Sequence, residues 1–115
     1  MKTKTAIRWK AIERRVREAQ VQGNPHKRGS EFVVRYQAKV KLHVPPHWHP
    51  CDEHITVLAG KFGVARGRAY DSKQLRPLGP GSYVWIPERQ PHFTVYNRGT
   101  VVQVHGTGPF KTIYI

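Results

Sequence analysis

The feature that most constrains the fold of this chain is a series of short β-rich runs, each closed by glycine or proline. From Glu31 to Lys41, apolar and polar residues alternate with a period of two, which predicts a strand with one buried face. Turn-forming residues separate the later runs, and none of these has a convincing helical periodicity. The runs cover residues 54–59, 61–66, 82–87, 92–97, 100–105 and 110–115. We therefore predict an all-β chain folded into an antiparallel sandwich or barrel.

The first thirty residues are less clearly patterned. Apolar residues recur at helical spacing from Trp9 to Ala19, but residues 19–22 alternate and then stop at a Gly-Asn-Pro turn signal. We expect a short opening segment followed by a strand. With 115 residues, the chain is expected to form one domain. In this domain, residues 1–30 are a basic N-terminal segment with at least one strand, and residues 31–115 are the barrel core.

The chain is strongly basic. Twenty Lys and Arg residues against seven acids give a formal net charge of +13, and twelve of the twenty lie within residues 1–41. Such a charge favours polyanions or anionic small molecules by electrostatic steering. No helix-turn-helix, zinc-finger or RNA-recognition signature is present, so we expect a solvated basic surface. A nucleic-acid partner is not expected, although the charge leaves it open.

Membrane insertion and secretion are not expected. No stretch approaches 18 apolar residues, and no apolar run follows the charged start of the chain. The single cysteine, Cys51, cannot form a disulfide within the chain, which fits a reducing compartment. We therefore expect a cytoplasmic protein without a membrane partner.

Five of the seven histidines lie between residues 43 and 92, and their spacing points to a metal site. On an extended backbone, residues two apart share a face, so His47 and His49 can point at one centre. Glu53 shares its face with the apolar residues of its own strand, and its carboxylate would therefore enter an apolar interior. Coordination to a cation is one remedy for the cost of burying it.

His92, from a distant strand, completes a mixed nitrogen and oxygen set that suits Mn, Fe, Co, Ni, Zn or Cu. Cysteine is not part of this set, so a structural zinc cage is not expected. One alternative stays open. A slip of one residue would aim His54 inward in place of Glu53 and give a site of four histidines.

The spacing of these residues resembles the two motifs of the cupin family. Residues 47–60 fit H-x-H-x3-E-x6-G, with His47, His49, Glu53 and Gly60 in place. Residues 81–92 fit most of G-x5-P-x-G-x2-H-x3-N, with Gly81, Pro87 and His92 in place, whereas Arg89 stands where that motif has its second glycine. From about Phe32 to the C-terminus, the chain is similar to the small single-domain cupins.

This resemblance implies a six- to eight-stranded jelly-roll β-barrel around one divalent metal, commonly in a dimer. The metal ligands of the family correspond to His47, His49, Glu53 and His92, and alignment on Gly60 favours Glu53 over His54. A homodimer is expected by the same analogy, with an N-terminal strand covering the sheet edge of a neighbouring copy.

A further histidine lies in the run 100–105. Either Gln103 and His105 face inward there, or Val102 and Val104 do. By analogy with cupins, the first arrangement would give an inward polar pair, in which His105 supports the metal or acts as a catalytic acid or base. The alternative is that His105 caps a strand end and hydrogen-bonds to the backbone.

These residues favour a metal-dependent enzyme that acts on a small molecule, with one Fe, Mn, Ni, Zn or Cu ion per chain. Three imidazoles and a carboxylate leave two open positions on an octahedral metal. Iron or copper would suit a dioxygenase, and manganese, nickel or zinc would suit Lewis-acid chemistry. Positive charge, including Arg35, Arg66 and Arg89, would favour an anionic substrate. The alternative function is a non-catalytic ligand-binding or regulatory cupin whose basic surface meets an anionic partner.

Overall fold

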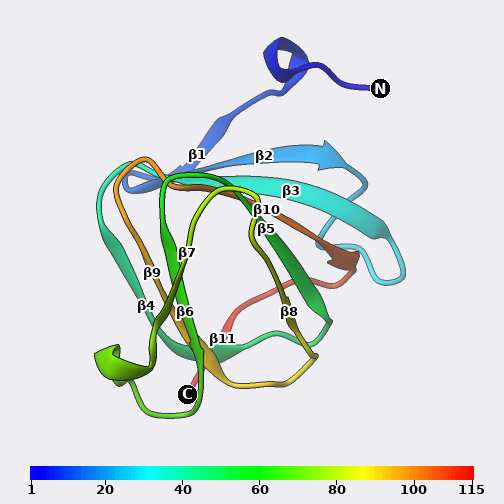
Figure 1. Ribbon diagram of the computed structural model, residues 1–115. Helices are drawn as coiled ribbons and strands as arrows, with labels where there is room; N and C mark the ends of the chain where they lie inside the picture. The colour runs from blue at the N-terminus through cyan, green and yellow to red at the C-terminus, as the bar shows by residue number, and fades with distance from the viewer.

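The computed structural model describes residues 1–115 and consists almost entirely of strands and loops (Figure 1). Two turns of 3-10 helix are present, η1 (Lys4–Ala6) and η2 (Ser72–Gln74). Neither of these helical segments is long enough to cross a membrane. The strands are β1 (Lys10–Glu13), β2 (Val16–Gln22), β3 (Glu31–Ala38), β4 (Leu42–Trp48), β5 (Glu53–Ala59), β6 (Phe62–Arg66), β7 (Arg76–Leu78), β8 (Tyr83–Ile86), β9 (His92–Tyr96), β10 (Val101–Thr107) and β11 (Ile113–Tyr114).

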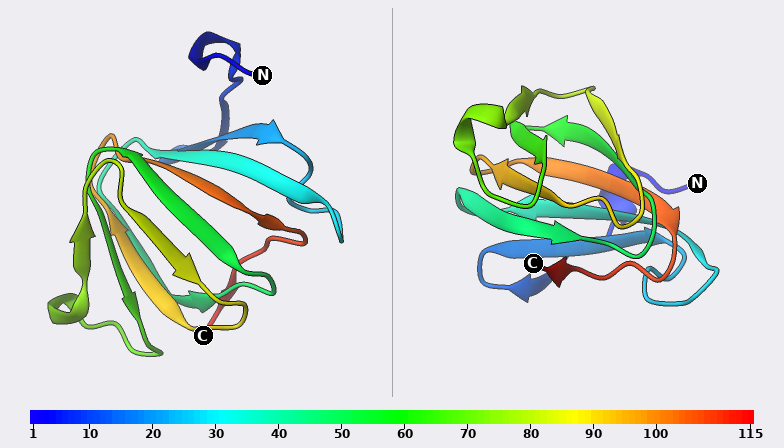
Figure 2. Two further views of the ribbon diagram at one scale, coloured as in Figure 1. Left: turned by 45° about the vertical axis from the view of Figure 1, so that its right-hand side comes forward. Right: turned by 90° about the horizontal axis from the view of Figure 1, so that it is seen from below.

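The strands form two antiparallel sheets that face each other (Figure 2). One sheet has the order β1-β2-β3-β10-β5-β8, and the other has the order β11-β4-β9-β6-β7. Strands far apart in the sequence are neighbours, since β10 lies between β3 and β5, and β9 lies between β4 and β6. This arrangement confirms the predicted all-β jelly roll. The two sheets are not joined by hydrogen bonds into one closed cylinder.

The N-terminal segment contributes two strands to the first sheet. β2 pairs with β3, and β1 adds to the outside of β2 as the edge strand. All four residues of β1 are exposed, because they have no further strand beside them. Within the N-terminal segment, the strands β1 and β2 are therefore part of the sheet, whereas residues 1–9 precede it.

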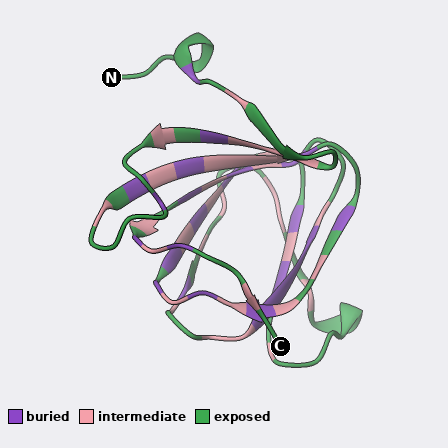
Figure 3. Ribbon diagram, turned by 180° about the vertical axis from the view of Figure 1, so that it is seen from behind, coloured by how far each residue is buried: buried purple, intermediate pink, exposed green.

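The core lies between the sheets and follows from the alternation of the strands. Buried residues are spread along the strands of both sheets, whereas η1 and most loops are exposed (Figure 3). In β10, Val102 and Val104 are buried, whereas His105 is exposed on the outer face. The central cluster consists of Phe32, Val34, Cys51, Ile55, Val57, Phe62, Val64, Ile86, Val102, Val104 and Phe110.

Gly60 and Gly99 allow a matched test of the packing at one end of the jelly roll. Both have a left-handed backbone, with φ of +80° and +83°. A Cβ at Gly60 would lie 2.6 Å from the Cα of Thr100, whereas a Cβ at Gly99 would meet nothing within 4 Å. Gly99→Ala should therefore cost only backbone strain, about 1 kcal/mol of unfolding free energy.

Gly60→Ala carries the same strain and a steric clash with backbone, so we expect it to cost at least about 2 kcal/mol. Denaturant unfolding of the two variants measures both losses. Equal losses would show that the contact between Gly60 and Thr100 does not constrain the fold.

Candidate metal centre

Three histidines and a glutamate meet at one end of the interior because of how β4, β5 and β9 begin and end. His47 lies near the end of β4, and His92 is the first residue of β9. The register places these two residues opposite each other. Between Val44 and His47 the register shifts by one residue, and this bulge contains Pro45 and Pro46. Proline lacks an N–H for the ladder, so a bulge is where a strand tolerates it.

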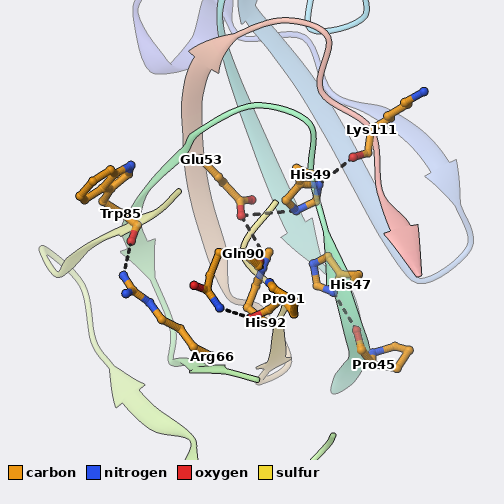
Figure 4. Close-up of polar contacts among 10 residues, drawn as sticks. All are labelled: Pro45, His47, His49, Glu53, Arg66, Trp85, Gln90, Pro91, His92 and Lys111. Atoms are coloured by element: carbon orange, nitrogen blue, oxygen red, sulfur yellow. Dashed lines mark hydrogen bonds and ion pairs between the residues drawn. The ribbon is translucent and has the colours of Figure 1, made fainter. Parts of the chain in front are cut away.

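The three imidazoles converge on one point. The nitrogen ligand atoms of His47, His49 and His92 all lie within 4.8 Å of one another, and all three residues are buried. Ring centroids are 4.2 Å apart for His47 and His92, and 4.9 Å apart for His47 and His49. The close-up shows the rings turned toward one another beside Glu53 (Figure 4). Three buried histidines in this arrangement can hold a metal ion.

Each of these imidazoles is fixed by its other nitrogen. The Nδ1 of His47 donates to the carbonyl of Pro45 (2.7 Å), that of His49 to Lys111 (2.9 Å), and that of His92 to Gln90 (2.9 Å) (Figure 4). A carbonyl oxygen only accepts, so the proton of each neutral ring resides on Nδ1. The Nε2 lone pairs are thereby left free, which is the arrangement that a metal-binding histidine needs.

Glu53 points into the same interior. Its Oε1 lies 3.4 Å from the Nε2 of His49 and 3.3 Å from the Nε2 of His92. Both Glu53 Oε1 and His49 Nε2 are buried and lack a hydrogen-bond partner. A buried carboxylate and a buried imidazole nitrogen without partners are costly. A divalent cation between them would satisfy both, so the residues present fit a metal ion.

The pKa shifts of Glu53, His47 and His49 are also consistent with binding of a cation. Burial alone would raise the pKa of Glu53, but hydrogen bonds from His49 and His92, when these rings carry a second proton on Nε2, outweigh it and lower the pKa to about 2. Burial and the nearby His92 lower the pKa of His47 to about 4, so that ring is neutral at pH 7. Burial lowers the pKa of His49, but the Glu53 carboxylate reverses the effect and raises it. A proton and a metal ion therefore compete for the Nε2 of His49.

His54 lies on the other side of its sheet. Its Nδ1 is 2.6 Å from the hydroxyl of Tyr83, and its half-buried ring faces outward, whereas Glu53 is buried. The structure thus has the register in which Glu53 and not His54 points into the interior.

The expected inward orientation of His105 is wrong. His105 pairs with His54 across the sheet, and the two rings stack on the outer face with centroids 4.7 Å apart. Val102 and Val104 take the inward positions because they can bury apolar surface without unpaired polar groups. His105 does not cap a strand end either, since β10 continues to Thr107. The structure therefore does not bring His105 to the histidine cluster.

A cavity of about 550 Å³ extends from the histidine cluster to the outside. Thr94 and Tyr96, which follow His92 on the inward face of β9, line it. Sequence reasoning missed the contribution of both chain ends. Ile12 and Arg15 line the cavity from the β1–β2 hairpin, and Phe110 lies with its ring centroid 4.5 Å from that of His49. No local motif in the sequence marks these residues.

The arginines expected to attract an anionic substrate lie elsewhere. Neither Arg35, Arg66 nor Arg89 lines the cavity. The Nε of Arg35 donates to the side chain of Gln103 (2.9 Å), and Arg66 donates to the carbonyl of Trp85 (2.8 Å) (Figure 4). Their charges therefore do not act within the site.

Cys51 is not placed to act as a reactive thiol. It is buried in the central cluster, and burial together with the carboxylates of Glu53 and Asp52 raises its pKa to about 11. The thiol is therefore protonated near neutral pH and is a poor nucleophile and metal ligand.

No protein-family model and no curated protein matches the chain, but solved structures do. The polyketide cyclase RemF from Streptomyces resistomycificus matches with a TM-score of 0.75 and 18% identity, over 100% of this chain and 84% of the other. KdgF from Halomonas sp. matches with a TM-score of 0.71 and 19% identity, over 92% and 93% of the two chains. An RmlC-like cupin from Shewanella frigidimarina matches with a TM-score of 0.72 and 15% identity, over 94% and 90%.

Similarity at these sequence identities shows a shared fold only. The activity has to be inferred from the residues of the site. The matches span almost the whole of this chain and most of each other chain, so the likeness extends from the N-terminal strands to the C-terminus. This agrees with the cupin motifs in the sequence and with the two facing sheets of the jelly roll. The protein therefore has the fold of a small cupin domain.

Proposed function

We propose that the protein is a metal-dependent enzyme that acts on a small molecule. In this proposal, one divalent transition metal ion per chain is held by His47, His49, Glu53 and His92. The observation that carries it is the fixed direction of the three imidazoles. Each Nδ1 is bound to a backbone carbonyl, so the Nε2 atoms of the three imidazoles converge. The unpartnered carboxylate oxygen of Glu53 lies 3.4 Å and 3.3 Å from two of them, those of His49 and His92.

A bound Mn, Fe, Ni, Zn or Cu ion would supply Lewis-acid polarisation of a substrate oxygen, and iron or copper would add redox chemistry of the kind used by dioxygenases. The protein's own residues contribute the rest. The backbone carbonyls hold the imidazoles in place before the metal arrives. The cavity beside them gives a small molecule access to the ligands, and half of its lining residues are hydrophobic. The fold neighbour RemF, named as a polyketide cyclase, shows that this fold can carry an enzyme.

The first test is the metal content of purified, tag-free protein measured by elemental analysis. We expect close to one first-row transition metal ion per chain in the wild type. His49→Ala removes one of the converging nitrogens and should lower the metal content by at least about 10-fold. The matched control is His54→Ala, which alters a neighbouring histidine on the outer face and should keep the wild-type metal content.

The identity of the metal separates the two kinds of chemistry, since iron or copper favours oxygenation and manganese, nickel or zinc favours Lewis-acid catalysis. Absence of metal from the wild type even after reconstitution would overturn the proposed enzyme. The alternative function, a non-catalytic ligand-binding or regulatory protein, would then be favoured.

We also propose a homodimer that forms through β1. This strand is the outer edge of its sheet, all of its residues are exposed, and Ile12 is 50% exposed. An unpaired edge with an exposed apolar residue is a surface on which a second copy can add a strand.

Light scattering of the purified protein tests this arrangement. The wild type should have twice the chain mass of 13.3 kDa. Ile12→Pro removes a backbone donor from the edge and should yield monomers, whereas Ile12→Thr keeps the donor and should remain dimeric. A wild type that is monomeric at micromolar concentration would contradict the proposal.

A further inference from the structure

We propose that the cavity accepts an uncharged molecule that carries an aromatic ring and oxygen atoms, and not the anionic substrate that the net charge of the chain suggests. This inference rests on the proposed function, because it takes the cavity beside the histidine cluster as the substrate site. Three properties of the cavity support it: the charges of its lining, the protonation of its tyrosines and the nature of its walls.

The lining has no free cation. Arg15 is the only Lys or Arg residue that lines the cavity, and its Nε lies 2.6 Å from Oε1 of Glu13, which also lies at the mouth. A second guanidinium nitrogen of Arg15 donates to the other oxygen of Glu13 (3.4 Å). Both side chains of this pair are exposed to solvent, so a carboxylate, sulfonate or phosphate group of a ligand at Arg15 would compete with Glu13 and with water.

The remaining charges of the lining are negative. Glu18 and Glu53 also line the cavity, so together with Glu13 its carboxylates outnumber its one guanidinium by two, and a divalent metal ion would offset this excess. The other nineteen Lys and Arg residues lie outside the lining. Three of them, Lys39, Lys61 and Arg98, are exposed on turns of the jelly roll. Solvent and salt screen such distant charges, whereas charges inside a cavity of low dielectric act at full strength.

The tyrosines inside the cavity are hydrogen-bond donors. Burial and the Glu18 carboxylate raise the pKa of Tyr36, and burial and Glu53 raise the pKa of Tyr96. Both hydroxyls are therefore protonated at neutral pH. They add no charge of their own and suit the carbonyl or hydroxyl oxygens of an uncharged ligand.

Aromatic side chains from both sheets form the walls. Tyr36 of β3 and Phe110 line one side, with ring centroids 6.5 Å apart. Phe62 of β6 and Tyr96 of β9 line the facing sheet and meet edge to face at 5.0 Å. Aromatic walls favour a ring by stacking and edge contacts as well as by burial of apolar area. A volume of about 550 Å³ lies within the range of small-molecule pockets.

The test uses two probes that share a ring system and differ in charge: 2,3-dihydroxynaphthalene, which is neutral at pH 7, and its 6-sulfonate. Each is titrated by calorimetry into the full chain, once as purified and once after removal of metal by a chelator. We expect the neutral probe to bind at least about 10-fold more tightly to the metal-free form, because burying the sulfonate beside the excess carboxylates of the lining is unfavourable. In the metal-bound form the ion offsets those carboxylates, so we expect the same preference by a smaller margin. Equal or tighter binding of the sulfonate, or no binding of either probe, would overturn the inference.

Salt dependence identifies which charges the sulfonate probe meets. If it meets the carboxylates of the cavity, higher salt should strengthen its binding by screening repulsion. If it is drawn instead by the surface lysines and arginines, higher salt should weaken its binding, and the inference would fail. This measurement uses the wild type alone, so it does not depend on the folding of any variant.

A pair of variants locates the effect. Glu18→Gln removes one negative charge from the lining and should strengthen binding of the sulfonate probe by about 3-fold to 10-fold, with less than about 2-fold change for the neutral probe. The control Glu31→Gln removes an exposed carboxylate outside the cavity and should change neither affinity. Equal effects of the two variants would show that net charge, and not the lining, sets the preference.

The outcomes separate this inference from the proposed function. A chain without metal that still prefers the neutral probe would sustain the charge and shape of the cavity while the proposed enzyme fails. A chain with one metal ion that binds the sulfonate probe equally well would sustain the metal centre and overturn the inference.

Discussion

The buried carboxylate of Glu53 is the constraint on which the rest of the site depends. Its strand is apolar on the inward face, where Ile55 and Val57 are also buried. Burial therefore removes water that would otherwise stabilise the charged carboxylate. Its nearest polar neighbours are the Nε2 atoms of His49 and His92, held there because their Nδ1 atoms donate to backbone carbonyls. The carbonyl that holds His49 belongs to Lys111, near the end of the chain. Satisfying one buried charge thus requires strands from both sheets and the C-terminal segment together.

The alternation of the sequence predicted the antiparallel sheets, and the His-x-His spacing predicted that His47 and His49 share a face. Both follow from the period of two, which is a local property of a strand. β10 was different, because valines stand on both of its faces at Val101, Val102 and Val104, so hydrophobicity did not determine its orientation. Packing between the two sheets determines the orientation: Val102 and Val104 face the core, and His105 faces outward. β4 is not among the predicted β-rich runs, and its pairing with β9 shows that its two prolines occupy a bulge.

The net charge of the chain does not predict the charges that line the cavity, for a related reason. A composition of +13 describes the whole surface, whereas a ligand inside a cavity responds to the few groups that line it. The sequence does not show that Arg15 would reach the cavity, nor that Glu13 would neutralise it two residues away. Nor does it show that Glu18, from a strand in the basic segment, would face Tyr36 in the interior. These positions depend on the pairing of β1, β2 and β3, which brings the β1–β2 hairpin to the mouth of the cavity.

Arg89 shows how the backbone around the ligands keeps its shape without the glycine that the cupin motif has at this position. Its φ is +64°, in the left-handed region that a glycine would adopt more readily. Two hydrogen bonds hold the loop in this conformation: the N–H of Arg89 donates to the carbonyl of His49 (2.8 Å), and the N–H of Glu88 donates to Asp52 (2.8 Å). Both acceptors lie in the segment that carries His49 and leads to Glu53. The loop before His92 is therefore fixed to the loop between the other ligands, so a strained residue is tolerated where it joins the two halves of the site.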